Sequence, residues 1–285
     1  MCNDYGKLSA NMNIMTKCHL FVILLAALLA AGCRNDGPGQ SLSEISEASE
    51  SSRMVKFRQY AVQLDRMEIE DALAAQWSRL DDISDSAAFQ SELELQAHFF
   101  SDPNSPMRSE EYLIPVMEKV LESPYATQVQ KEDATYFLPL FSLNRIGTPA
   151  ADFTFTLKGG RTRTLHSVNA EHIILFFSNP GCEDCRKTTE QVSGDPYLQD
   201  LIDKGRLAVV NIYPDNDIDA WYGYVTNYPD NWISGYAPGI DEPDVNGVQL
   251  YNIRAIPSLY LLDSDGNVVM KDAPLEKIID GIVRK

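Results

Sequence analysis

Basic residues are scarce in this sequence. Its 285 residues include 24 lysines and arginines against 41 aspartates and glutamates, which gives a formal net charge of −17. Because this excess of negative charge repels polyanions, the composition argues against nucleic acid or an anionic lipid surface as a partner. A chain of this length has room for two modest domains with cores of their own.

A hydrophobic run long enough to span a membrane is also absent. The longest apolar stretch, Leu20–Ala31, is shorter than the ~20 residues that a membrane-spanning helix needs. Lys17 precedes it and small residues follow up to Cys33, which is the layout of a secretory signal peptide. Residues 1–14 carry no export pattern, so we expect translation to start at Met15.

This segment resembles a bacterial lipoprotein signal, in which small residues precede the cysteine that becomes the lipid-bearing N-terminus. The resemblance implies that the protein is exported and lipid-anchored through Cys33 in the bacterial cell envelope, facing the periplasm. Ordinary cleavage, which would leave Cys33 as a free thiol, is the alternative.

Cysteine is rare, and its positions limit what it can do. Of the five cysteines, Cys2 and Cys18 leave with the signal, and Cys33 is the predicted lipid site. Only Cys182 and Cys185 remain in the mature chain, in a compartment that permits disulfides. One pair so close in sequence does not staple a fold, so we interpret it as chemical rather than structural.

The sequence predicts four regions. Residues 1–33 form the signal peptide, and 34–53, rich in Gly, Pro, Ser and Glu, form a flexible tether. Apolar residues at helical spacing predict an all-α domain over 54–145. After the Gly147-Thr148-Pro149 turn the period becomes that of strands and helices in alternation, which predicts an α/β domain over 146–285.

The α/β domain is organised around the stretch Phe176–Cys185. An apolar strand ends at a Pro-Gly turn, and a helix is predicted to open with Cys182 in its first turn. Unpaired N–H groups and the positive end of the helix dipole stabilise a thiolate at that position. Cys185 lies one turn further on the same helix face, close enough to form a disulfide with Cys182. The pattern predicts dithiol–disulfide exchange.

Residues 147–285 resemble the TlpA/ResA-like branch of the thioredoxin superfamily. The matching features are the Gly147-Thr148-Pro149 turn, the strand–CxxC–helix unit and Ile256-Pro257 before a final Asp-Gly hairpin. The resemblance implies an α/β thioredoxin-like fold, a mixed sheet flanked by helices, preceded here by a small all-α domain. That all-α part is similar to an uncharacterised region found ahead of such domains in envelope lipoproteins of Gram-negative bacteria.

The resemblance also implies roles for four residues. Cys182 is the expected attacking thiolate and Cys185 the resolving thiol. Pro257 is the expected cis-proline beside them, with Ile256 offering backbone groups to an extended client strand. Protein thiols and disulfides are the expected clients, with a membrane or periplasmic electron donor and no cofactor besides the Cys182–Cys185 disulfide.

Two features bear on the redox poise. The buried acid of thioredoxins is replaced by Phe176, and Asp241 or Glu242 are the candidates to substitute for it. Glu183 and Asp184 stand beside Cys182 and oppose its ionisation, which predicts a reductant- or isomerase-leaning couple. Arg186 and Lys187, one turn on, act against this effect.

Other chemistries fit the sequence less well. A structural zinc site needs four ligands, for which only His166 and His172 could join the two cysteines. A peroxiredoxin-like peroxidase wants Thr or Ser where Asn179 stands, and no base is marked for a cysteine hydrolase. The main alternative is a non-catalytic binding lipoprotein that uses the domain as a scaffold. Its groove would be lined by aromatic residues for which packing in the interior is the favoured interpretation: Trp221, Tyr222, Tyr224, Tyr228, Trp232 and Tyr236.

Overall fold

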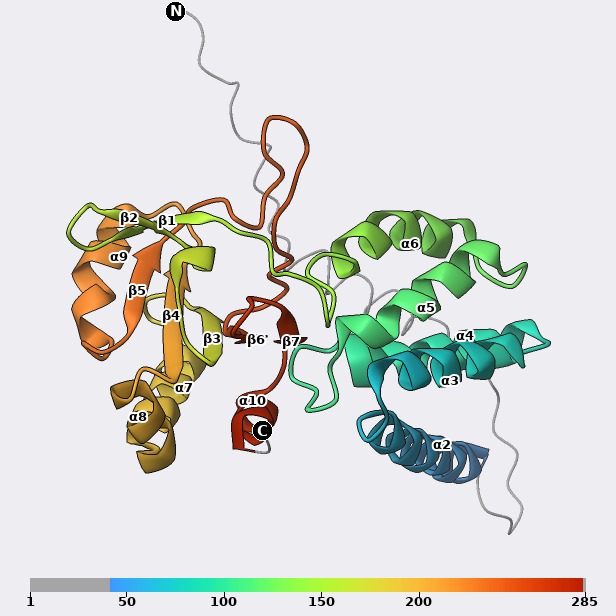
Figure 1. The fold of residues 1–285 in the computed structure, drawn as a ribbon. Coiled ribbons are helices and arrows are strands. Elements are labelled where there is room, and N and C mark those ends of the chain that lie inside the picture. The colour runs from blue at the N-terminus through green and yellow to red at the C-terminus, as the bar shows by residue number, and fades with distance from the viewer. Residues whose placement is uncertain (1–41, 284–285) are drawn as a thin grey trace, which may run out of the picture. The chain divides into compact units, whose positions relative to one another are not determined.

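The computed structural model describes residues 42–283, and for 42–51 the backbone alone (Figure 1). Its first part is helical. It consists of α2 (Leu42–Leu64), α3 (Ile69–Asp81), α4 (Ser86–Gln96), the π-helical turn η1 (Ala97–Ser101), α5 (Glu110–Glu122) and α6 (Gln128–Phe141). The predicted signal segment and Cys33 lie outside the described residues.

The structure differs from the sequence prediction at the tether. The predicted coil over 34–53 is helical from Leu42 onward, where α2 begins. Between Leu42 and Leu64 the sequence has neither proline nor glycine, and many of its residues are good helix formers. The low hydrophobicity of this segment was therefore not sufficient evidence for a coil.

The helical region has an apolar interior built from helix faces at 3.6-residue spacing. Its buried side chains include Phe57, Leu64, Leu80, Phe89, Phe100, Leu113 and Val120. Helix α5 packs against both α3 and α6. Aromatic rings fill the junction of α2 with η1, where the ring centroids of Phe57 and Phe99 are 5.0 Å apart.

The second part is a seven-stranded mixed sheet. Its strands are β1 (Thr154–Leu157), β2 (Thr162–Thr164), β3 (His172–Phe177), β4 (Leu207–Tyr213), β5 (Ile233–Tyr236), β6 (Ser258–Asp263) and β7 (Val268–Met270), in the spatial order β2-β1-β5-β4-β3-β6-β7. The central strands β3, β4 and β5 are parallel, and the outer pairs are antiparallel. The predicted fold class, a mixed sheet flanked by helices after a helical region, is confirmed.

Helices α7 (Glu183–Gly194), α8 (Pro196–Asp203), α9 (Ile218–Tyr224) and α10 (Leu275–Val283) belong to this part, with the short 3-10 turns η2 (Leu165–Ser167) and η3 (Val225–Asn227). Strand β3 is buried on both faces. Ile174 and Phe176 pack into the core lined by α7, α8 and α10, whereas Leu175 and Phe177 pack into the opposite core beneath the β1–β2 hairpin. This two-sided burial explains the continuous apolar run in the sequence.

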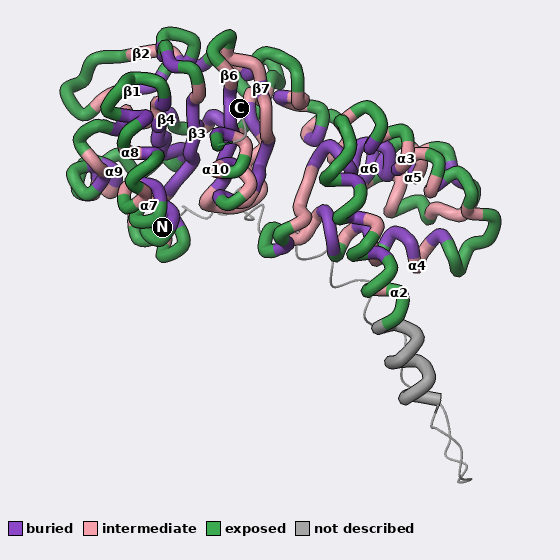
Figure 2. The backbone as a smooth tube through the Cα atoms, turned by 60° about the horizontal axis from the view of Figure 1, so that its bottom comes forward, coloured by how far each residue is buried: buried purple, intermediate pink, exposed green. Residues whose placement is uncertain are grey.

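From Phe57 onward the chain forms one compact unit. Figure 2 shows the central strands buried along their length and the outer turns of the helices exposed. In the part of the chain that the structure describes, we find no helix with the length and apolar character needed to cross a membrane.

Candidate functional site

The two cysteines lie at the start of α7, which follows β3 after a short turn. Cys182 is the N-cap residue of α7, and its Sγ accepts a hydrogen bond from the Cys185 N–H at 3.1 Å. The turn before it needs Gly181, whose φ of +78° favours a residue without a side chain. Cys182 and Cys185 form a disulfide with a Cα–Cα distance of 5.2 Å. Cys182 is half-buried and Cys185 is buried, so the outer sulfur is the accessible one.

The loop before β6 lies against this disulfide. The Ile256–Pro257 peptide bond is cis, and the Ile256 carbonyl oxygen is 3.9 Å from the Sγ of Cys182. Both residues of the dipeptide are half-buried. The structure thus brings together the four predicted site residues that lie within the described part of the chain.

The carboxylates beside Cys182 are paired with cations. Arg186 donates to Glu183 at 2.6 Å and also bonds Glu190, while Lys187 donates to Asp184 at 2.9 Å. The hydrogen bond from Arg186 lowers the pKa of Glu183, and the one to Asp184 raises the pKa of Lys187. All these side chains are exposed, so each pair is weak and sensitive to salt. Pairing reduces the field that Glu183 and Asp184 exert on the sulfur.

A neutral polar cluster lies where β3 ends, four residues before Cys182, and sequence reasoning missed it. Asn211 of β4 pairs with Phe176 across the sheet, and its Oδ1 accepts a 2.5 Å hydrogen bond from the buried Ser178. The Ser178 hydroxyl also bonds that of Tyr228 at 2.8 Å, and burial raises the pKa of Tyr228. The sequence signal was an asparagine inside an otherwise apolar strand.

The two candidate substitutes for the missing acid differ in their surroundings. Asp241 is half-buried, and burial raises its pKa, with Glu242 and Asp215 adding to the effect. Glu242 is exposed. Asp215 instead accepts a hydrogen bond of 2.5 Å from Asn179, which lies three residues before Cys182.

The aromatic residues proposed to line a groove are mostly part of the interior. Trp221, Tyr228 and Trp232 are buried. Trp221 stacks on Tyr236 with ring centroids 5.6 Å apart, and Tyr228 stacks on Trp232 at 6.5 Å. Of the set, Tyr222 is the most exposed, at 42%. Packing therefore accounts for most of these side chains, with Tyr222 as the exception.

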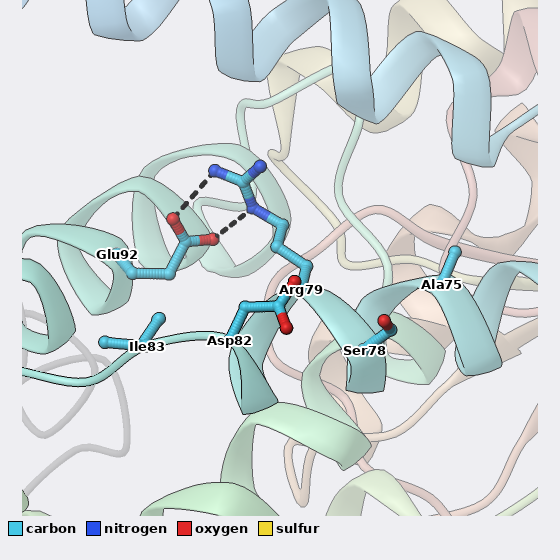
Figure 3. A pocket seen from close by; sticks show the side chains of 6 residues that line it. All are labelled: Ala75, Ser78, Arg79, Asp82, Ile83 and Glu92. Carbon is cyan, nitrogen blue, oxygen red and sulfur yellow. Dashed lines mark hydrogen bonds and ion pairs between the residues drawn. The ribbon is translucent and has the colours of Figure 1, made fainter.

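An open pocket of about 560 Å³ lies on the helical region (Figure 3). The bidentate pair of Arg79 and Glu92, with contacts of 2.6 and 2.8 Å, forms its polar wall. The pocket is lined by α3, the turn that follows it and α4, and includes no residue of the disulfide loop. Among the side chains that the structure describes, no three of His, Cys, Asp or Glu gather as a metal site would require.

This fold, with a disulfide at the start of α7 facing a cis-proline, defines the thioredoxin class, and comparison with known proteins agrees. A model of a thioredoxin-like domain matches residues 165–273. A model of a domain of unknown function, DUF5106, matches residues 45–144. A thioredoxin-like protein from Bacteroides caccae of known crystal structure is 35% identical, covers 84% of this chain and 84% of its own, and superposes with a TM-score of 0.74. The chain belongs to the thioredoxin-like proteins.

Two further relatives each match less than half of the chain. The C-terminal domain of an uncharacterized protein from Bacteroides fragilis is 37% identical over 49% of this chain and 98% of its own, with a TM-score of 0.46. Nucleoredoxin from Bos taurus is 25% identical over 122 residues, which are 42% of this chain and 27% of nucleoredoxin. The chain thus spans about a quarter of that curated relative. The predicted membership of the thioredoxin superfamily, with an uncharacterised helical region ahead of it, is confirmed, and the fold supports a redox role.

Proposed function

We propose that this protein is a membrane-anchored thiol–disulfide oxidoreductase of the bacterial cell envelope, which exchanges disulfides with protein clients through Cys182 and Cys185. One observation carries the proposal: a disulfide at the first turn of α7 with its outer sulfur 3.9 Å from the Ile256 carbonyl beside cis-Pro257. A scaffold that only binds has no use for two sulfurs at a helix start.

The reaction begins with the reduced dithiol. The Cys182 thiolate attacks one sulfur of a client disulfide, forms a mixed disulfide and releases the other client sulfur as a thiolate, which takes up a proton. The Cys185 thiol loses its proton and attacks Cys182, closing the disulfide and freeing the second client sulfur. Two electrons pass to the client, and a membrane or periplasmic dithiol donor returns them.

Positioning of the client follows from the loop. An extended client strand hydrogen-bonds to the backbone of Ile256, whose carbonyl is already beside the attacking sulfur. The helix terminus supplies the activation, since the Cys185 N–H points at the Sγ of Cys182 and stabilises negative charge there. No external base is required.

The proposal is tested on the mature chain by reduction of insulin disulfides with glutathione as the electron source. Wild type is expected to accelerate the reaction, and Cys182→Ser is expected to abolish the acceleration. In cells, Cys185→Ser is expected to accumulate mixed disulfides with client proteins, because the resolving thiol is absent. A wild-type protein that is as inactive as Cys182→Ser would leave a binding lipoprotein as the better description.

We further propose a reductant- or isomerase-leaning couple. Glu183 and Asp184 oppose ionisation of Cys182, although their pairing with Arg186 and Lys187 limits the effect. Known couples run from about −120 to about −270 mV. Equilibration of the chain with glutathione buffers measures the potential, and a value at the oxidising end would show this part of the proposal to be wrong.

The anchoring through Cys33 is proposed from the signal-like segment alone. Wild type is expected in the membrane fraction of lysed cells and Cys33→Ser in the soluble periplasmic fraction. Equal distribution of the two proteins would contradict lipidation.

A further inference from the structure

The loop that carries Ile256 and Pro257 is held by buried charges from the helical region. Arg254, two residues before Ile256, has a buried guanidinium whose Nη1 donates to the Ser101 carbonyl at 2.8 Å. Its Nε lies 3.1 Å from the Glu110 carboxylate at the start of α5. Asn252, earlier in the same loop, also donates to Glu110.

The other end of the loop is fixed by the segment after β7. Asp272 accepts a 2.6 Å hydrogen bond from Arg254 and a weaker one, at 3.4 Å, from Ser258, the residue that follows Pro257. Its φ of +45° is unusual for a residue with a side chain, which marks a backbone held by its surroundings. The Asp272 carboxylate thus accepts hydrogen bonds from residues on both sides of the cis-proline.

Glu110 is the centre of this arrangement. Its side chain is fully buried and forms a second ion pair, at 2.7 Å, with the buried Lys271. Lys271 in turn donates to the carbonyl oxygens of Phe141, at 2.8 Å, and Leu143 at the end of the helical region. The hydrogen bonds that Arg254 donates to Ser101 and Asp272 are directional, so they fix the loop. The ion pairs of Glu110 with Arg254 and Lys271 add electrostatic attraction.

We propose that the helical region is a positioning element of the disulfide-exchange site: Glu110, acting through Arg254, sets the place of the Ile256–Pro257 backbone against the sulfur of Cys182. The inference rests on the proposed function, because it assigns the loop to the binding of client protein. Glu110 and Arg254 are positioning residues and touch no client themselves. A small displacement of a positioned group is enough to slow a reaction by an order of magnitude or more.

The test compares a protein disulfide with one that has no backbone. Glu110→Gln and Arg254→Lys are assayed with insulin and with 2-hydroxyethyl disulfide. We expect kcat/KM on insulin to fall at least about tenfold, mostly through KM. The rate with 2-hydroxyethyl disulfide and the equilibrium constant with glutathione should each change less than about twofold. Lys277→Ala is the matched control, because Lys277 pairs with Asp65 at 2.5 Å and links α10 to the helical region through a pair that includes no residue of the loop.

A second readout does not depend on activity. The Arg254 side chain is only 6% exposed, so trypsin should not cut after it in the native protein. In Glu110→Gln, cleavage between Arg254 and Ala255 is expected to accelerate at least about tenfold, and in Lys277→Ala to stay at the wild-type rate. Asn252→Ala, which loses a single hydrogen bond to Glu110, replaces Glu110→Gln if that variant does not fold.

The outcomes separate the two proposals. An unchanged insulin rate and an unchanged tryptic cut in folded variants would overturn the positioning role, as would an equal loss with both disulfides. Failure of the wild type with both substrates, joined to accelerated cleavage in Glu110→Gln, would overturn the proposed function while the bracing of the loop would stand.

Discussion

Two tyrosines of one core offer a matched test of how buried hydroxyls act on stability. Tyr251 and Tyr260 are both fully buried, in the core beneath the β1–β2 hairpin, with ring centroids 5.7 Å apart. The hydroxyl of Tyr251 donates to the Ala151 carbonyl at 2.7 Å. The hydroxyl of Tyr260 has no hydrogen-bond partner among the described residues. The same substitution, Tyr to Phe, should therefore have opposite consequences.

Tyr251→Phe removes a hydrogen bond and leaves a carbonyl unpaired, which should lower the free energy of unfolding by about 0.5–1.5 kcal/mol. Tyr260→Phe removes a buried hydroxyl whose lost hydration no protein hydrogen bond replaces. This substitution should leave the free energy of unfolding unchanged or raise it by up to ~1 kcal/mol. Urea unfolding at pH 7, with equal m values, measures the difference. A larger loss in Tyr260→Phe than in Tyr251→Phe would refute the reasoning.

The same pair predicts a pH dependence. Burial raises the pKa of Tyr251 and of Tyr260 above the ordinary value of 10.0, with smaller contributions from nearby carboxylates. Above pH ~10 the unfolded chain loses phenolic protons that the folded chain keeps, so stability present below that pH is lost as pH rises. The slope that each tyrosine contributes rises toward about 1.4 kcal/mol per pH unit above pH 10, so each Phe variant should lose about 1 kcal/mol less than wild type between pH 10 and 11.

Three further predictions concern single positions. Gly235→Ala places a Cβ 2.4 Å from the Phe155 ring and should cost ~1–3 kcal/mol in thermal or urea unfolding, whereas Gly223→Ala, with open space around it in α9, should gain ~0.4–1 kcal/mol. Asp195→Ala removes the cap that accepts from the N–H groups of Tyr197 and Leu198 and should cost about 1 kcal/mol, most of which Asp195→Asn should restore. Arg186→Gln leaves Glu183 without this partner beside Cys182 and should make the reduction potential measured against glutathione more negative, with the shift vanishing in 1 M salt.

Local signals in the sequence predicted much of this fold. Asp195-Pro196 marks the start of α8, and Gly160, with a φ of +76°, makes the turn of the β1–β2 hairpin. The apolar run of β3 and the cysteine spacing placed the disulfide at the correct helix end. In each case the physical cause acts over a few residues, so the pattern is visible in the chain itself.

Longer-range features could not be predicted in this way. Strand β5 has a glycine in its centre and prolines on either side, and only its pairing with β4 and β1 makes it a strand. Glu110 reads as an ordinary acid in the first turn of a helix, yet it is buried against Arg254 and Lys271, far away in sequence. The Ser178–Asn211 bond likewise joins the residue after β3 to the interior of β4, two segments that only the sheet brings together.

The buried ion group has a practical consequence for how this protein is divided. A shortened chain that begins after Arg145 would keep Arg254 and Lys271 but lose Glu110, and with it a carboxylate that neutralises both cations. Removal of the helical region would expose both cations to water and would leave the Ile256–Pro257 loop without its contacts to Ser101 and Glu110. An isolated C-terminal half is therefore expected to misreport both folding and client kinetics, and enzymology should start from a chain that retains everything from α2 onward.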